Sequence, residues 1–191
     1  MKTIARLFLL LGCSLGLLHS CNDPMELNNK KALRMLEECP DEYKLTQVVP
    51  LTTKYIDFRE EDMQAYKTHY ESLSDNGFIE LEQRGELYHL TFTEAANEFL
   101  VASQEAKNYN SNYRRNAMFG SSVKFVITSR RKVSEVLEIQ ERPQVNVAEV
   151  TAKLEVTDET PFYFLESKYD LKAKKRFVFR KTTDGWKYCK P

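Results

Sequence analysis

The first half of the chain places apolar residues every three or four positions, the period of an amphipathic helix. A helix is predicted over residues 29–38, where leucines form one stripe and a Cys-Pro pair ends the pattern. A second helix is predicted from about Glu60 to Asp75. Asn76-Gly77 should end it, because Asn and Gly accept the left-handed conformation of a helix C-cap.

A hairpin and a third helix are expected next. Two short apolar runs, 78–82 and 87–91, predict strands joined by a Gly-containing loop. Thr91 and Glu94 have the spacing of a capping box, which predicts a third helix continuing to about Ala106. These elements predict a single unit over residues 29–107.

Beyond residue 122 the period changes to two. Residues 108–122 are rich in Asn, Ser and Gly and are expected to be a linker. After them, apolar and polar residues alternate, most clearly over 148–156. Strands are predicted near 123–128, 133–141, 145–157, 173–182 and 185–189. The fold class predicted is therefore α+β, with a small helical unit followed by an antiparallel β-sheet subdomain over 123–191.

The amino-terminal segment predicts export. A short cationic region precedes an apolar run, Leu7–Leu18, which is shorter than the roughly 20 residues of a transmembrane helix. The run ends in Leu18-His19-Ser20-Cys21, which resembles the lipobox of bacterial lipoprotein precursors, with His19 where the family has a small residue. The resemblance implies that residues 1–20 are a cleaved signal peptide. It also implies that Cys21 carries the diacylglycerol and acyl chains, such as palmitate.

Alternatives to this anchor remain open. A second match ending at Cys13 leaves a shorter apolar run, and an ordinary secretion signal or an uncleaved anchor would also place the body outside the cytoplasm. In the lipoprotein interpretation residues 21–28 are a lipidated tether. Asn22 replaces the Asp of the enteric retention signal, which favours the periplasmic face of the outer membrane.

Export gives the other cysteines a meaning. With Cys13 removed and Cys21 acylated, Cys39 and Cys189 are left in an oxidising compartment, where thiols pair. They are the candidate disulfide, and two buried thiols are the alternative. Neither has a second Cys or His at ligand spacing, so no metal and no cofactor are expected.

Residues 60–104 resemble the recognition helix, wing and following helix of winged-helix proteins of the MarR or PadR kind. Carried over, the DNA contacts of that family would be Gln64, Lys67, Thr68, Asn76 and Arg84. Charge argues against this role, because residues 54–100 hold four Lys/Arg and eleven Asp/Glu, a net charge of −7. No nucleic-acid partner is expected.

The carboxyl-terminal part is basic. Residues 105–191 hold eighteen Lys/Arg and eleven Asp/Glu, a net charge of +7. Its strands and closing Asp-Gly-Trp-Lys turn resemble the last strands of cystatin-like or nuclear-transport-factor-like sheets, which implies a concave face able to bind a ligand or protein. A Trp that only caps a small core is the favoured alternative. The candidate contacts for an anion or partner are Lys172, Lys174, Lys175, Arg176, Arg130, Arg131 and Lys132. Lysines guarding a solvated sheet edge are the alternative.

Catalytic motifs are missing from the sequence. His69 and His89 are the histidines that follow the leader, and neither belongs to a known catalytic or phosphate-binding motif. The chain is therefore expected not to be an enzyme but a membrane-anchored envelope module, binding or structural, whose partner is another envelope protein. An inhibitor or immunity-type lipoprotein that neutralises an incoming toxin or hydrolase is one alternative. An envelope enzyme of unknown chemistry is another.

Overall fold

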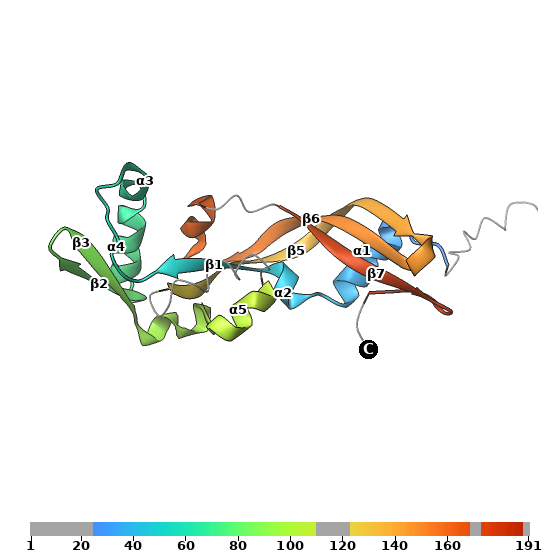
Figure 1. The fold of residues 1–191 in the computed structure, drawn as a ribbon, viewed down its shortest axis with the longest axis horizontal. Helices are drawn as coiled ribbons and strands as arrows, with labels where there is room; N and C mark the ends of the chain where they lie inside the picture. The colour runs from blue at the N-terminus through green and yellow to red at the C-terminus, as the bar shows by residue number, and fades with distance from the viewer. Residues whose placement is uncertain (1–24, 110–122, 169–172, 189–191) are drawn as a thin grey trace, which may run out of the picture.

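The computed structural model describes residues 25–109, 123–168 and 173–188 and has the predicted α+β architecture (Figure 1). A six-stranded antiparallel sheet has the order β1-β5-β6-β7-β8, with β4 also paired to β5. A separate two-stranded sheet is formed by β2 and β3. The molecule is elongated, with α1 toward one end and the β2–β3 hairpin at the other (Figure 1).

The first helix, α1, spans Asn29–Glu38, as the sequence predicts. The side chain of Asn28 caps it by accepting a hydrogen bond from the Lys31 amide at 2.9 Å. Ala32 and Leu36 are buried against the sheet, which makes α1 part of the sheet's core. A short helix α2, Glu42–Leu45, leads directly into β1, Thr46–Thr52.

The predicted second helix is divided into α3, Glu61–Gln64, and α4, Lys67–Asp75. Its predicted end is confirmed, because Asn76 is the C-cap and Gly77 has a φ of +76°. The amide of Phe78 then donates to the Leu73 carbonyl at 2.9 Å, which closes the last turn. The predicted hairpin follows as β2, Ile79–Arg84, and β3, Leu87–Phe92.

The predicted third helix is wrong. Thr91 remains in β3 opposite Glu80, and the chain then forms a 3-10 helix η1, Glu94–Phe99, a short strand β4, Leu100–Val101, and helix α5, Ser103–Tyr109. Tertiary contacts override the capping signal, because Phe99 packs edge-on against Phe162 and Leu100 pairs with Val126 of the large sheet.

The two strands predicted after the linker are one 20-residue strand, β5, Val123–Arg142, with three register shifts. The polar residues 128–131, at and after the end of the first predicted strand, have specific side-chain partners, described below. The remaining elements are η4, Pro143–Val145; β6, Val147–Glu159; η5, Tyr163–Lys168; β7, Lys174–Thr182; and β8, Gly185–Lys187.

Two main cores lie along β5. In the first core, α1 packs on β6, β7 and the carboxyl-terminal half of β5, and Trp186 also belongs to this core. In the second core, α4, the β2–β3 hairpin and η5 pack against β1 and the amino-terminal half of β5. The predicted units 29–107 and 123–191 therefore share one sheet and both cores, and most of the predicted linker (110–122) lies outside the described residues.

Candidate functional site

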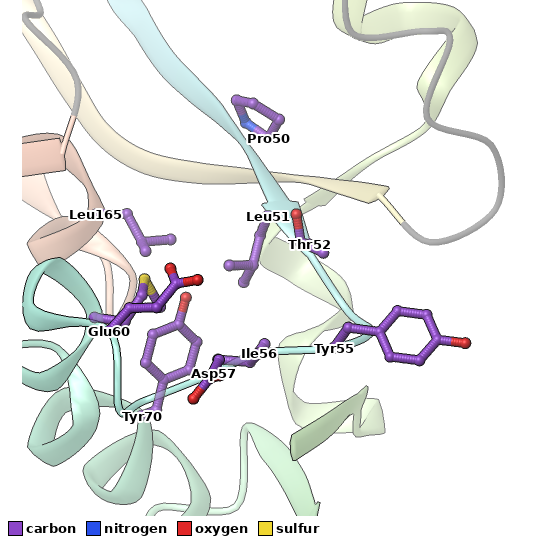
Figure 2. A pocket seen from close by; sticks show the side chains of 10 residues that line it. Pro50, Leu51, Thr52, Tyr55, Ile56, Asp57, Glu60, Tyr70 and Leu165 are labelled. Carbon is purple, nitrogen blue, oxygen red and sulfur yellow. The ribbon is translucent and has the colours of Figure 1, made fainter. Parts of the chain in front are cut away.

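A cavity of about 220 Å³ opens at the hairpin end of the molecule (Figure 2). Its walls include the apolar side chains of Leu51, Ile56 and Leu165. The Tyr70 hydroxyl and the Glu60 carboxylate are turned toward the same space (Figure 2). The cavity therefore combines an apolar floor with a polar, partly anionic mouth.

Tyr55, beside this mouth, is the most exposed large hydrophobic residue among the described residues, with 71% of its surface accessible. Its φ is +60°, a left-handed conformation that is costly for a bulky side chain. Its ring points away from the cavity (Figure 2) and meets the His89 ring edge-on, with centroids 5.8 Å apart.

Backbone pairing on both sides holds Tyr55 in this conformation. Ile56 and Tyr88 exchange two backbone hydrogen bonds of 3.0 and 2.9 Å, and the Leu90 amide donates to the Thr53 carbonyl at 3.0 Å. The segment 53–56 is thereby fixed along the outer edge of β3. A strained backbone that displays an aromatic ring to solvent is typical of a contact residue.

Carboxylates outnumber cations in this part of the chain. Arg59 donates two side-chain hydrogen bonds to Asp57 and also pairs with Glu86, and the Arg59 bonds lower the pKa of Asp57 to about 2. Arg84 pairs with Glu82 at 2.6 Å and lowers its pKa. Lys54, next to Tyr55, is exposed and takes part in none of the ion pairs found among the described residues, and exposed acids remain at Glu60, Glu61, Glu80 and Glu94. We call this acidic surface around Tyr55 the hairpin end.

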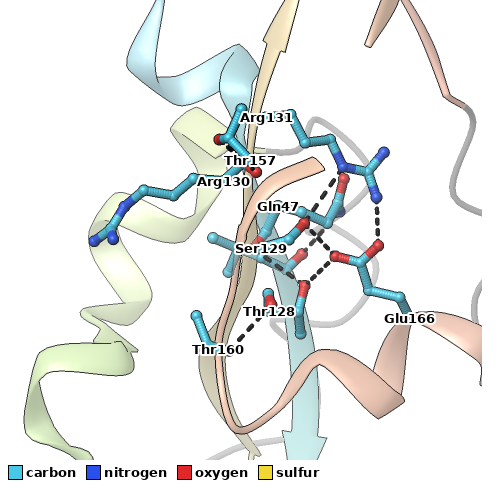
Figure 3. Close-up of polar contacts among 9 residues, drawn as sticks. Gln47, Thr128, Ser129, Arg130, Arg131, Thr157, Thr160 and Glu166 are labelled. Carbon is cyan, nitrogen blue, oxygen red and sulfur yellow. Dashed lines mark hydrogen bonds and ion pairs between the residues drawn. The ribbon is translucent and has the colours of Figure 1, made fainter. Parts of the chain in front are cut away.

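A buried ion pair joins β5 to η5 (Figure 3). Arg131 pairs with Glu166, and their side chains are only 7% and 10% exposed. The hydroxyls of Thr128 and Ser129 donate to Glu166 Oε1 at 2.8 and 2.5 Å. This network satisfies the polar residues in the middle of β5 and fixes η5 against the sheet, so it is structural.

The basic residues predicted as anion or partner contacts lie in different environments. Arg131 is buried as described, while Arg130 forms an exposed pair with Asp158 at 2.9 Å. Lys174 and Arg176 alternate with buried Phe177 and therefore lie on the sheet face opposite α1. Lys175 points to the other face, where burial and the nearby Arg131 lower its pKa. Lys132 is exposed on β5, and Lys172 lies outside the described residues.

The cysteine predictions fall at the limits of the described chain. Cys39 follows α1 as its C-cap residue and is half-buried. Cys189 and Cys21 lie outside the described residues, so the Cys39–Cys189 pairing and the acylation of Cys21 stay predictions. The hydroxyl of Tyr188, the residue before Cys189, donates a hydrogen bond to Asp41 Oδ2 at 3.5 Å.

The two histidines in the described part of the chain make packing contacts. His69 stacks on Phe164, with ring centroids 4.7 Å apart, and His89 meets Tyr55. Within residues 25–109, 123–168 and 173–188, no group of three or more His, Cys, Asp or Glu residues could hold a metal ion. In the same part of the chain, no helix has the length and apolar character needed to cross a membrane.

Comparison with known proteins found no matching family model, no matching curated protein and no matching solved structure. The functional argument therefore starts from the residues and their geometry. Tyr55 and Glu166, which organise the two polar sites above, were not singled out from the sequence. Neither has a local signal, because each depends on a backbone conformation or a partner set by the tertiary fold.

Proposed function

We propose that this chain is a bacterial envelope lipoprotein, held by acylated Cys21 on the periplasmic face of the outer membrane. Its folded body acts as a non-catalytic module that binds another envelope protein through the hairpin end. The observation that carries the proposal is the placement of two features at opposite ends of an elongated body (Figure 1). These features are the start of the described chain and the hairpin that carries exposed Tyr55.

The start of the described chain, at Met25, is fixed close to the last strand. The indole Nε1 of Trp186 donates to the Met25 carbonyl at 3.0 Å, and Leu27 is buried in the core beneath α1. A tether leaving at Met25 therefore holds this end near the membrane and leaves the hairpin end free to meet a partner.

The chemistry of the hairpin end indicates the kind of partner. Tyr is enriched at interface hot spots, because it combines a large rigid ring with a polar hydroxyl. The surrounding carboxylates favour a partner surface rich in Lys or Arg and speed its approach at low ionic strength. A basic protein surface with a recess for the Tyr55 ring fits these features.

Acylation is tested by replacing Cys21. Wild-type protein should incorporate labelled palmitate, lose residues 1–20 and fractionate with the outer membrane, whereas Cys21→Ser should do none of these. Cys13→Ser is the matched control and should behave as wild type. Unchanged size, labelling and fractionation of Cys21→Ser would rule out the lipoprotein.

Partner binding is tested by a photo-crosslinking amino acid at the exposed position Lys54. We expect one discrete cross-linked protein in cells, and its loss when Tyr55→Asn is added, since Asn tolerates a positive φ and leaves the fold intact. The same cross-linker at Leu137, exposed on the large sheet, is the control. Identical products from both positions, or no effect of Tyr55→Asn, would contradict binding through the hairpin end.

A further inference from the structure

The end of the body at which the chain emerges lies close to the bilayer, if Cys21 is acylated as proposed. Met25 follows Cys21 by four residues, and four residues of trans chain span at most about 14 Å. The Trp186 indole fixes the Met25 carbonyl beside β8. Whatever path the tether takes, Met25 therefore lies within roughly that distance of the acylated residue, and Trp186 of the β7–β8 hairpin lies next to Met25.

Two loops meet at this end. Lys181 in β7 donates its amide to the Asn146 carbonyl at 2.8 Å, which ties the turn between β5 and β6 to the β7–β8 hairpin. Val145, in the first of these turns, is 62% exposed, and Asn146 next to it has a φ of +52°. The turn thus presents an apolar side chain at its tip. We call this region, residues 142–147 and 180–187 with Met25, the loop end.

Cations are concentrated around this apolar tip. Arg142 precedes the turn, Arg180 lies opposite Val147, and Lys187 lies opposite Arg180. On the α1 side, Lys30, Lys31 and Arg34 line a groove of about 490 Å³ with Trp186 and Asp184. Both the α1 side of this end and the opposite face of the sheet therefore carry cations.

The cations at these positions do not serve to stabilise the sheet. Arg180 and Lys187 are direct cross-strand neighbours, and so are Lys174 and Lys153 on the same face. Like charges placed directly opposite each other destabilise a sheet. The carboxylate of Glu149 neutralises part of the face by pairing with Arg142 at 2.6 Å and Arg176 at 3.0 Å, and Asp184 lies 3.6 Å from Lys187. Arg180 takes part in none of the ion pairs found among the described residues.

We infer that the loop end docks on anionic lipid headgroups of the membrane that holds the acyl chains. Val145 enters the headgroup region, and Arg142, Arg180 and Lys187 meet lipid phosphates. Each basic residue close to an anionic surface adds about a factor of five in binding, within a Debye length of about 8 to 10 Å. The acidic hairpin end is repelled by the same surface, so the contact also orients the body.

The test uses the chain from residue 21 onward with Cys21→Ser, so that binding is independent of acylation. Sedimentation with vesicles should show binding to equal parts phosphatidylcholine and phosphatidylglycerol, little binding to phosphatidylcholine alone, and release by added salt. Arg180→Glu should weaken binding roughly five- to twentyfold. Val145→Asp should weaken it as well.

Two features of this test separate docking from folding. Arg180→Glu places an acid opposite Lys187, so the variant should be at least as stable as wild type while it loses vesicle binding. Lys54→Glu makes the same charge change at the hairpin end and should bind as the parent chain does.

Each remaining outcome decides the inference. Equal binding to both kinds of vesicle, or equal binding by Arg180→Glu and Lys54→Glu, overturns it. It is also overturned if the Arg180→Glu variant still binds vesicles as the parent chain does but no longer binds an acidic protein, because the site would then be a protein-binding site. Acyl labelling of Cys21 is measured separately, so the lipoprotein and the headgroup contact fail independently.

Discussion

Gly77 ends α4 in a left-handed conformation, with a φ of +76°, and no heavy atom lies within 4 Å of the position that a Cβ would occupy. Gly77→Ala should therefore lower the free energy of unfolding by about 1 kcal/mol through backbone strain alone. Gly77→Asn should lose less, since Asn adopts this conformation more readily. Urea denaturation measures both, and equal losses for Ala and Asn would contradict strain as the cause.

Arg131 and Arg130 are adjacent in sequence but differ in burial, which makes them matched probes. Arg131→Met leaves Glu166 buried without its partner and should cost roughly 3 to 5 kcal/mol. Arg130→Met removes an exposed pair with Asp158 and should cost less than about 1 kcal/mol.

The double variant Arg131→Met with Glu166→Leu completes this comparison. It should recover much of the stability lost by Arg131→Met, because no uncompensated charge remains buried. Chemical denaturation of the wild type, Arg131→Met, Glu166→Leu and the double variant measures the coupling. Losses of similar size for Arg130→Met and Arg131→Met would show that the buried network does not fix η5.

Elements governed by local signals could be predicted from the sequence. The stripe of α1, the Asn76-Gly77 stop and the β2–β3 hairpin all depend on neighbouring residues, and all are present. The continuous β5 could not be predicted, because its polar middle is stabilised by Glu166, more than thirty residues away. The same holds for Tyr55, whose strained conformation depends on pairing with Tyr88.

The strand β5 contributes Val126 to the core beneath the hairpin and Val136 to the core beneath α1. Because one strand runs through both cores, we expect them to unfold in a single transition. Val126→Ala should lower the stability by roughly 2 kcal/mol. It should shift the unfolding midpoint reported by Trp186 fluorescence, although Trp186 belongs to the other core.

The control for this prediction is Leu137→Ala, on the exposed side of the same strand, which should change stability by less than about 0.5 kcal/mol. Hydrogen exchange of β2 and β3 amides gives the second probe. If these amides exchange at a different denaturant concentration from the Trp186 transition, the cores are independent units.

On the scale of the whole molecule, a Cys39–Cys189 bridge would close a loop of about 150 residues and should contribute roughly 2 to 5 kcal/mol. Cys39→Ser, Cys189→Ser and the double variant should lose the same stability, because each breaks the same bond. Denaturation with and without reductant measures this. A double variant that loses the sum of two different single losses would indicate two separate thiols.

Charge is also distributed on this scale. The acidic hairpin end and the basic loop end lie at opposite ends of the long axis, which gives the body a permanent dipole. Its orientation at a charged surface should therefore depend on ionic strength. This orientation is measured by the quenching of a dye by the lipid. A dye attached at Val145→Cys is compared with a dye attached at Lys54→Cys.

Tension along the tether proposed above would reach the body at Met25, where the Trp186 indole donates a hydrogen bond to the backbone carbonyl. A pull on the amino terminus is therefore shared with the β7–β8 hairpin instead of falling on α1 alone. Separating α1 from the sheet by such a pull requires the hydrogen bond between Trp186 and Met25 to break first. A protein fastened to a membrane and drawn sideways by a moving partner gains mechanical resistance from that single side-chain contact.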